Sequence, residues 1–71
     1  MPKIEIQYIR GPKTDIIRIA TGVETYYMDA NNAVNYVRRI HTFMPLTLND
    51  IHFGDSVPGE YRNRVLKELN L

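Results

Sequence analysis

The sequence contains no cysteine and no tryptophan, and neither sign of charge is in clear excess. Without cysteine, the chain can form neither a disulfide framework nor a thiolate metal site. Nine Lys and Arg residues against eight Asp and Glu residues give a formal net charge of +1. This balance is unlike the clearly basic composition of most nucleic-acid-binding domains, and equally unlike an acidic nucleic-acid mimic.

Long apolar runs are also absent. No stretch approaches the ~20 apolar residues of a membrane-spanning helix. Charged residues at Lys3 and Glu5 interrupt the segment in which a signal peptide would have its apolar core. The sequence therefore predicts a cytoplasmic protein with no membrane partner.

The 71 residues, of which 44% are hydrophobic and 24% charged, have the composition of an ordinary globular protein. We expect a single α+β domain over residues 1–71. A domain of this size buries only about 60% of the surface of its unfolded chain, so its stability is expected to be marginal. Because disulfides are excluded, this raises the expectation of self-association or of a protein partner.

Three segments show strand character. Apolar and polar side chains alternate over residues 3–10, and β-branched or aromatic residues fill 16–20 and 23–28. Gly11-Pro12 and Thr21-Gly22 are turn signals between them. Connections this short predict a three-stranded antiparallel meander.

Two helices are predicted after the strands. Asp29 is a candidate N-cap for the first, which should end before Pro45. The second contains Val57, Tyr61, Val65 and Leu69, which lie four residues apart in the sequence, and it has Pro58 in its first turn. The expected fold is therefore a βββαα arrangement of three strands followed by two helices, with a core of Ile4, Ile6, Tyr8, Ile17, Ile19, Val34, Val37, Ile40, Val65 and Leu69.

Residues 46–55 are ambiguous between the two predicted helices. Leu46-Thr47-Leu48 and Ile51-His52-Phe53 flank Asn49-Asp50 as the arms of a small hairpin would. Alternatively, Thr47 caps a single helical turn that ends at Gly54. We favour the helical turn.

Two helices cover one face of a three-stranded sheet, yet apolar residues occur on both faces of the predicted strands. Some of these side chains must lie on the uncovered face, where they would form a contiguous patch together with an arginine. Aromatic residues and arginine are enriched where proteins bind one another. We therefore predict a protein interface made of Ile9, Ile16, Arg18, Tyr26 and Tyr27.

Motifs for catalysis or cofactor binding are not found. Gly11-Pro12-Lys13-Thr14 resembles the end of a phosphate-binding loop, but the first glycine of that motif is replaced by Ile6 and a strand follows. The only serine, Ser56, lacks the glycines of a nucleophile elbow and is expected to cap a helix. The two histidines, His41 and His52, match no metal-ligand spacing, and His41 is expected to be a packing residue. We expect no catalytic residue, no metal ligand, no cofactor and no small-molecule substrate.

A helix-turn-helix segment is the alternative interpretation. Residues 47–51 could begin a first helix, Ser56-Val57 could form the turn, and residues 61–66 could form a recognition helix. His52 and Arg62 argue against it, because they stand where the motif needs a small residue and an apolar one. The nucleic-acid-binding residues in this case would be Arg38, Arg39, Arg62, Asn63 and Arg64.

The leading functional hypothesis is a small protein-interaction module: an adaptor, inhibitor or regulator of a larger protein machine that acts by binding rather than by catalysis. Its partner would be another protein, a second copy of itself in a homodimer, or both. The alternative is a small DNA- or RNA-binding regulator that uses the helix-turn-helix-like segment.

Overall fold

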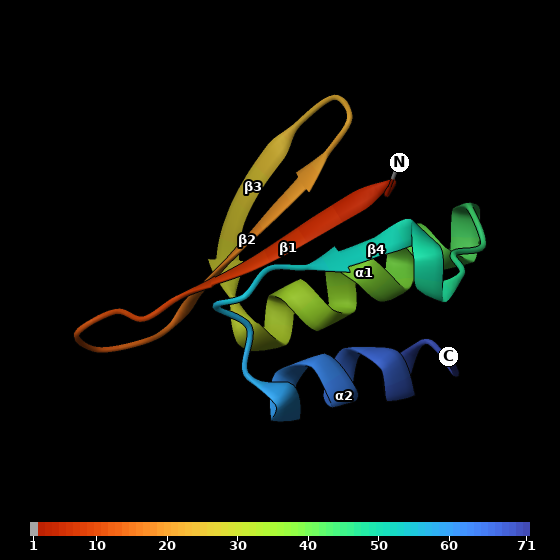
Figure 1. Cartoon of the computed structure of the whole chain (residues 1–71). Coiled ribbons are helices and arrows are strands. Elements are labelled where there is room, and N and C mark those ends of the chain that lie inside the picture. The colour runs from red at the N-terminus through yellow and green to blue at the C-terminus, as the bar shows by residue number, and fades with distance from the viewer. Residues whose placement is uncertain (1) are drawn as a thin grey trace.

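The segments with strand character form a sheet of antiparallel and parallel strands, and two helices pack on one face of this sheet. A computed structural model describes residues 2–71 (Figure 1). Its elements, in chain order, are β1 (Ile4–Ile9), β2 (Ile16–Thr21), β3 (Thr25–Asp29), α1 (Ala30–Phe43), the 3-10 turn η1 (Leu48–Asp50), β4 (Ile51–Phe53) and α2 (Gly59–Glu68).

The four strands lie in the order β3-β2-β1-β4, so β1 and β2 are central. β1 pairs antiparallel with β2, placing Ile6 opposite Ile19, and β2 pairs antiparallel with β3. β4 pairs parallel with β1, placing Ile51 opposite Ile4. Ile4, Ile6 and Ile19 are each at most 1% exposed, because they share the face that the helices cover.

The predicted α+β class and the consecutive antiparallel strands β1, β2 and β3 are confirmed, whereas the βββαα order is only partly matched and the prediction of a three-stranded antiparallel sheet is wrong. Strand β4 lies between the two helices in the chain and adds a fourth, parallel strand. The Gly54 N–H donates to the Ile6 carbonyl at 2.8 Å, and the Lys3 N–H donates to the Asp50 carbonyl at 2.7 Å. These bonds are made with a distant part of the chain, so local sequence signals give little indication of the strand.

The segment that was ambiguous in the sequence forms a turn followed by this strand. The Asp50 carboxylate accepts from the Thr47 backbone N–H at 2.9 Å and from its hydroxyl at 3.2 Å. The bond from the Thr47 backbone is the main reason that the pKa of the Asp50 carboxyl lies below its usual value. The favoured helical turn is present at 48–50, but it ends at Asp50 rather than at Gly54, and the hairpin is wrong because Ile51–Phe53 pairs with β1 instead.

Both helix boundaries follow from capping and proline. Asp29 caps α1 as predicted, since its Oδ1 accepts from the Asn32 N–H at 2.8 Å. α1 ends at Phe43, two residues before Pro45. His41 stabilises the exit from α1, because its Nδ1 accepts from the Leu46 N–H at 2.8 Å.

The hydrophobic core lies between the sheet and the two helices. Eight of the predicted core residues are buried, while Tyr8 and Ile40 are only partly buried against the same cluster. The buried residues that the sequence analysis did not include are Ala33, Leu46, Ile51 and Tyr61.

The two helices lie side by side on the same side of the sheet (Figure 1). Tyr61 joins them: its hydroxyl donates to the Ala30 carbonyl at 2.9 Å, and its ring meets Tyr8 edge to face at 5.7 Å. Burial raises the pKa of the Tyr61 phenol to about 12. Within residues 2–71, neither helix has both the length and the apolar character needed to cross a bilayer.

The assignment of the two sheet faces can be tested on one strand. Replacing Ile6 by Ala removes a fully buried side chain, and we expect the free energy of unfolding to fall by about 2–5 kcal/mol. Ile9→Ala on the same strand is the control, because Ile9 is 42% exposed and its loss should cost less than about 1 kcal/mol. Urea denaturation followed by circular dichroism measures both values. Equal losses would show that the faces are misassigned.

The raised pKa of Tyr61 predicts a loss of stability at alkaline pH. Its folded-state pKa of about 12 lies above the ordinary 10.0, so the unfolded chain loses this proton first as the pH rises. The resulting stabilisation is complete below about pH 10 and disappears as the pH approaches 12, a difference on the order of 2 kcal/mol. Urea titrations at several pH values should show this decrease, and a smaller one in Tyr61→Phe. An identical decrease in the variant would contradict the assignment to Tyr61.

Candidate interaction surface

The face of the sheet opposite the helices has no covering element in the described chain (Figure 1). Alternation along each strand assigns its side chains, because the residues between the buried ones point away from the helices. We call this the outer face; its residues are Glu5, Gln7, Ile9, Ile16, Arg18, Ala20, Thr25, Tyr27, Asp29 and His52.

A polar group occupies the centre of the outer face. Arg18 lies opposite Gln7 in the sheet, and its Nη1 donates to Gln7 Oε1 at 3.4 Å and lies 3.5 Å from Glu5 Oε1. Gln7 Nε2 in turn donates to Glu5 Oε1 at 3.5 Å. Because these side chains are partly exposed, the ion pair adds little stability. The contacts do place the three side chains next to one another on the outer face.

Apolar side chains surround this polar centre. Ile9 lies directly opposite Ile16 at the end of the β1–β2 pair. Tyr27 lies opposite Arg18 on β3 and is 63% exposed. Ala20 lies further along β2. Of the five predicted interface residues, Ile9, Ile16, Arg18 and Tyr27 are therefore brought together on one surface.

Tyr26 is the exception, and its prediction as an outer-face residue is wrong. It pairs with buried Ile19, and successive side chains of a strand point to opposite faces, so Tyr26 lies on the helix side. Its ring meets that of Tyr36 in α1 at 5.3 Å and an interplanar angle of 61°. Its hydroxyl is hydrogen-bonded to the Glu24 carboxylate, which raises the pKa of Tyr26 to about 12.

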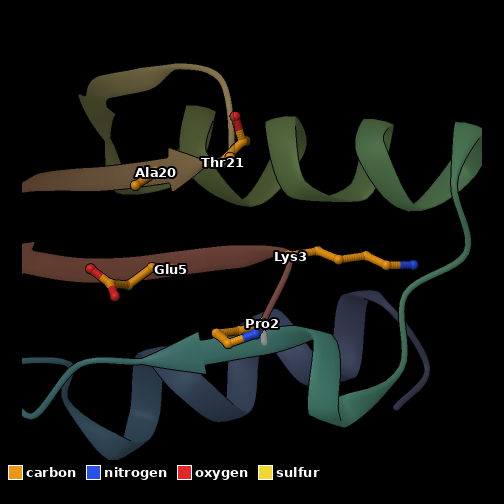
Figure 2. A pocket seen from close by; sticks show the side chains of 6 residues that line it. Pro2, Lys3, Glu5, Ala20 and Thr21 are labelled. Atoms are coloured by element: carbon orange, nitrogen blue, oxygen red, sulfur yellow. The ribbon is translucent and has the colours of Figure 1, made fainter.

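A hollow of about 330 Å³ lies at one end of the outer face. Figure 2 shows Glu5 and Ala20 on neighbouring strands, with Pro2 and Lys3 just before β1 and Thr21 at the end of β2. The hollow is shallow and open, so it extends the outer face rather than forming an enclosed ligand cavity.

The sequence analysis missed a second exposed apolar region beside this hollow. Val23, in the β2–β3 turn, is 92% exposed and lines a pocket of about 380 Å³ together with Ile40 and Met44. Phe43, at the end of α1, is 84% exposed. The available signal was the apolar pair Phe43-Met44 just before Pro45.

The residues of the nucleic-acid alternative do not form one cluster. On α2, Arg62 lies over the Phe53 ring of β4 at 5.5 Å, whereas Arg64 Nη2 donates to Asn31 Oδ1 of α1 at 2.6 Å. The two arginines thus leave α2 towards opposite neighbours. Arg38 Nη1 lies 3.3 Å from Glu68 Oε1. The two remaining predicted residues, Arg39 and Asn63, are exposed on α1 and α2.

The helix-turn-helix geometry itself is wrong. Its proposed first helix consists of the short turn 48–50 followed by strand 51–53, which belongs to the sheet. A strand hydrogen-bonded to β1 cannot cross a recognition helix as the motif requires. If α2 binds nucleic acid, it must therefore do so in a way other than as the recognition helix of a helix-turn-helix motif.

The residues considered for chemistry have structural partners. The Ser56 hydroxyl accepts from the Tyr8 backbone N–H at 3.0 Å, so its expected role as a helix cap is wrong. α2 instead follows Pro58, which makes no side-chain cap. His41 bonds the backbone of Leu46, as described above. Within residues 2–71, no three His, Asp or Glu side chains come together as metal ligands would.

Comparison of the chain with protein-family models, with curated protein sequences and with solved structures finds no match.

Proposed function

We propose that the chain is a small cytoplasmic protein-interaction module, an adaptor, inhibitor or regulator that acts by binding rather than by catalysis. The observation that supports this proposal is the uncovered outer face, on which Ile9, Ile16 and Tyr27 lie near Arg18. We propose this face as the docking surface for another protein.

The energetic argument concerns the isoleucines and the tyrosine. Full burial of one large apolar side chain contributes about 1.5–3 kcal/mol, which is a large fraction of the net stability of a small domain. Ile9 and Tyr27 remain 42% and 63% exposed, so much of that contribution is available to a partner. Contiguous apolar surface on neighbouring strands is characteristic of binding sites.

The polar residues of the outer face favour recognition over chemistry. Arg18 contacts Gln7 and Glu5 on the neighbouring strand, which places its guanidinium among the apolar residues of the outer face. Arginine is among the residues that dominate binding energies. The expected partner surface is apolar, with an acceptor group opposite Arg18.

Site-specific photo-crosslinking tests this proposal. A photoreactive phenylalanine at position 16, in the apolar part of the outer face at the end of the β1–β2 pair, should form an adduct with a protein in an extract of the native host. The same probe at Asn35, exposed on α1, is the control and should form none. Adding Ile9→Glu should abolish the adduct, because a carboxylate beside position 16 would have to be desolvated on binding. Mass spectrometry of the adduct gives its composition.

Three results would contradict the proposal: equal labelling from positions 16 and 35, labelling that survives Ile9→Glu, or no protein adduct at position 16. Nucleic acid crosslinked to the α2 arginines would favour the alternative of a DNA- or RNA-binding regulator. In that case retention on DNA or RNA should decrease steeply between about 50 and 200 mM salt, as counterion release requires. The outer-face interpretation predicts no such dependence.

A further inference from the structure

The two edges of the sheet differ in how they are protected. β4, at one edge, has only three residues. Beyond it, the Ser56 hydroxyl accepts from the Tyr8 N–H of β1 at 3.0 Å, so the exposed part of β1 is also satisfied. β3, at the other edge, has five residues, and no described strand lies beside it.

The register shows which backbone groups of β3 are free. The Thr21 N–H donates to the Glu24 carbonyl at 2.8 Å and closes the β2–β3 turn. In an antiparallel pair, hydrogen-bonded and non-hydrogen-bonded positions alternate. Tyr26 and Met28 therefore bond to β2, whereas Thr25 and Tyr27 direct their N–H and C=O groups away from the sheet.

β3 lacks the features that usually protect an edge strand. Lysine, proline, bulges and inward-pointing charges normally discourage pairing with another chain. The strand reads Thr-Tyr-Tyr-Met-Asp, and its only charge is at the terminal Asp29, whose carboxylate is occupied in capping α1. Its aromatic and β-branched residues favour strand pairing.

We propose that a second copy of this chain pairs antiparallel with β3, about a two-fold axis at Tyr27, and joins two four-stranded sheets into one. Antiparallel pairing of a strand with itself places residue 27 opposite residue 27, and residue 25 opposite residue 29. Thr25 then meets Asp29, and the only charge of the strand faces a neutral hydroxyl rather than its own copy. On the helix side, Tyr26 meets Met28, a favourable sulfur–aromatic contact.

This pairing fits a second copy better than an unrelated strand because the edge is self-complementary. Its odd length centres Tyr27, whose free N–H and C=O can bond those of its own copy in both directions. The axis is perpendicular to the sheet, so both pairs of helices stay on one side. The two outer faces become continuous, with both Tyr27 rings between the two Arg18 side chains. The dimer forms through the free backbone groups of β3, and of the proposed docking residues it involves only Tyr27; Ile9 and Ile16, on β1 and β2, belong to the docking surface alone.

Sedimentation equilibrium of the full chain tests the dimer. The native protein should sediment at twice the monomer mass of 8.3 kDa. Tyr27→Lys and Tyr27→Glu should each raise the dimer dissociation constant by about tenfold or more, because like charges then face one another at the axis. An equimolar mixture of these two variants should again form dimers, since Lys and Glu then face each other. Position 27 is exposed, so both variants should keep the native circular dichroism spectrum.

Thr25 provides a second, independent pair of variants. Residue 25 faces Asp29 in this register, so Thr25→Lys should strengthen the dimer and Thr25→Glu should weaken it. Ile16→Glu, on the outer face, should leave the dimer intact while abolishing docking, which separates this proposal from the proposed function. A chain that stays monomeric at about 1 mM, a concentration at which even weak pairing would be populated, overturns the proposal. So does a dimer in which the mixture at position 27 fails to restore association or the two Thr25 variants behave alike.

Discussion

The structure depends on the alternation of side chains along β1. Ile4 and Ile6 point towards the helices and are 1% exposed, while the residues between them point to the outer face. Because β1 is paired on both sides, its register also sets those of β2 and β4. A shift of one residue would exchange the two faces and expose the core. The position of every outer-face residue follows from this register.

The same constraint explains why the outer face is mixed rather than apolar. Both helices lie on one side, and residues 2–71 contain no third helix to cover the other. Glu5, Gln7 and Arg18 keep the centre hydrated, whereas Ile9 and Ile16 place apolar surface beside them. These polar residues therefore reduce the apolar area that the outer face exposes to water, but they do not eliminate it. A face of this kind tolerates water but gains free energy when it is covered.

Much of the fold could be predicted because its signals are local. The Asp29 cap, the end of α1 before Pro45 and the strand alternation each involve neighbouring residues. Strand β4 could not be predicted, because three residues show too little periodicity and the strand is formed only by its bonds to β1. At the candidate site, four of the five predicted residues share a surface. The misplaced one, Tyr26, belongs to a pair of consecutive tyrosines, and only the register of β3 against β2 decides which points outwards.

Tyr26 and Tyr27 together show why β3 is a well-defined edge. Tyr26 is fixed on the helix side by Tyr36 and Glu24, and Asp29 fixes the end of the strand as the cap of α1. An edge strand anchored on one face and at one end pays little conformational entropy when another strand pairs with it. β3 is therefore too well ordered for disorder to prevent its pairing with another strand. Since β3 also has no proline and no charge before its terminal Asp29, its free backbone groups remain accessible, ordered and suited to a partner strand.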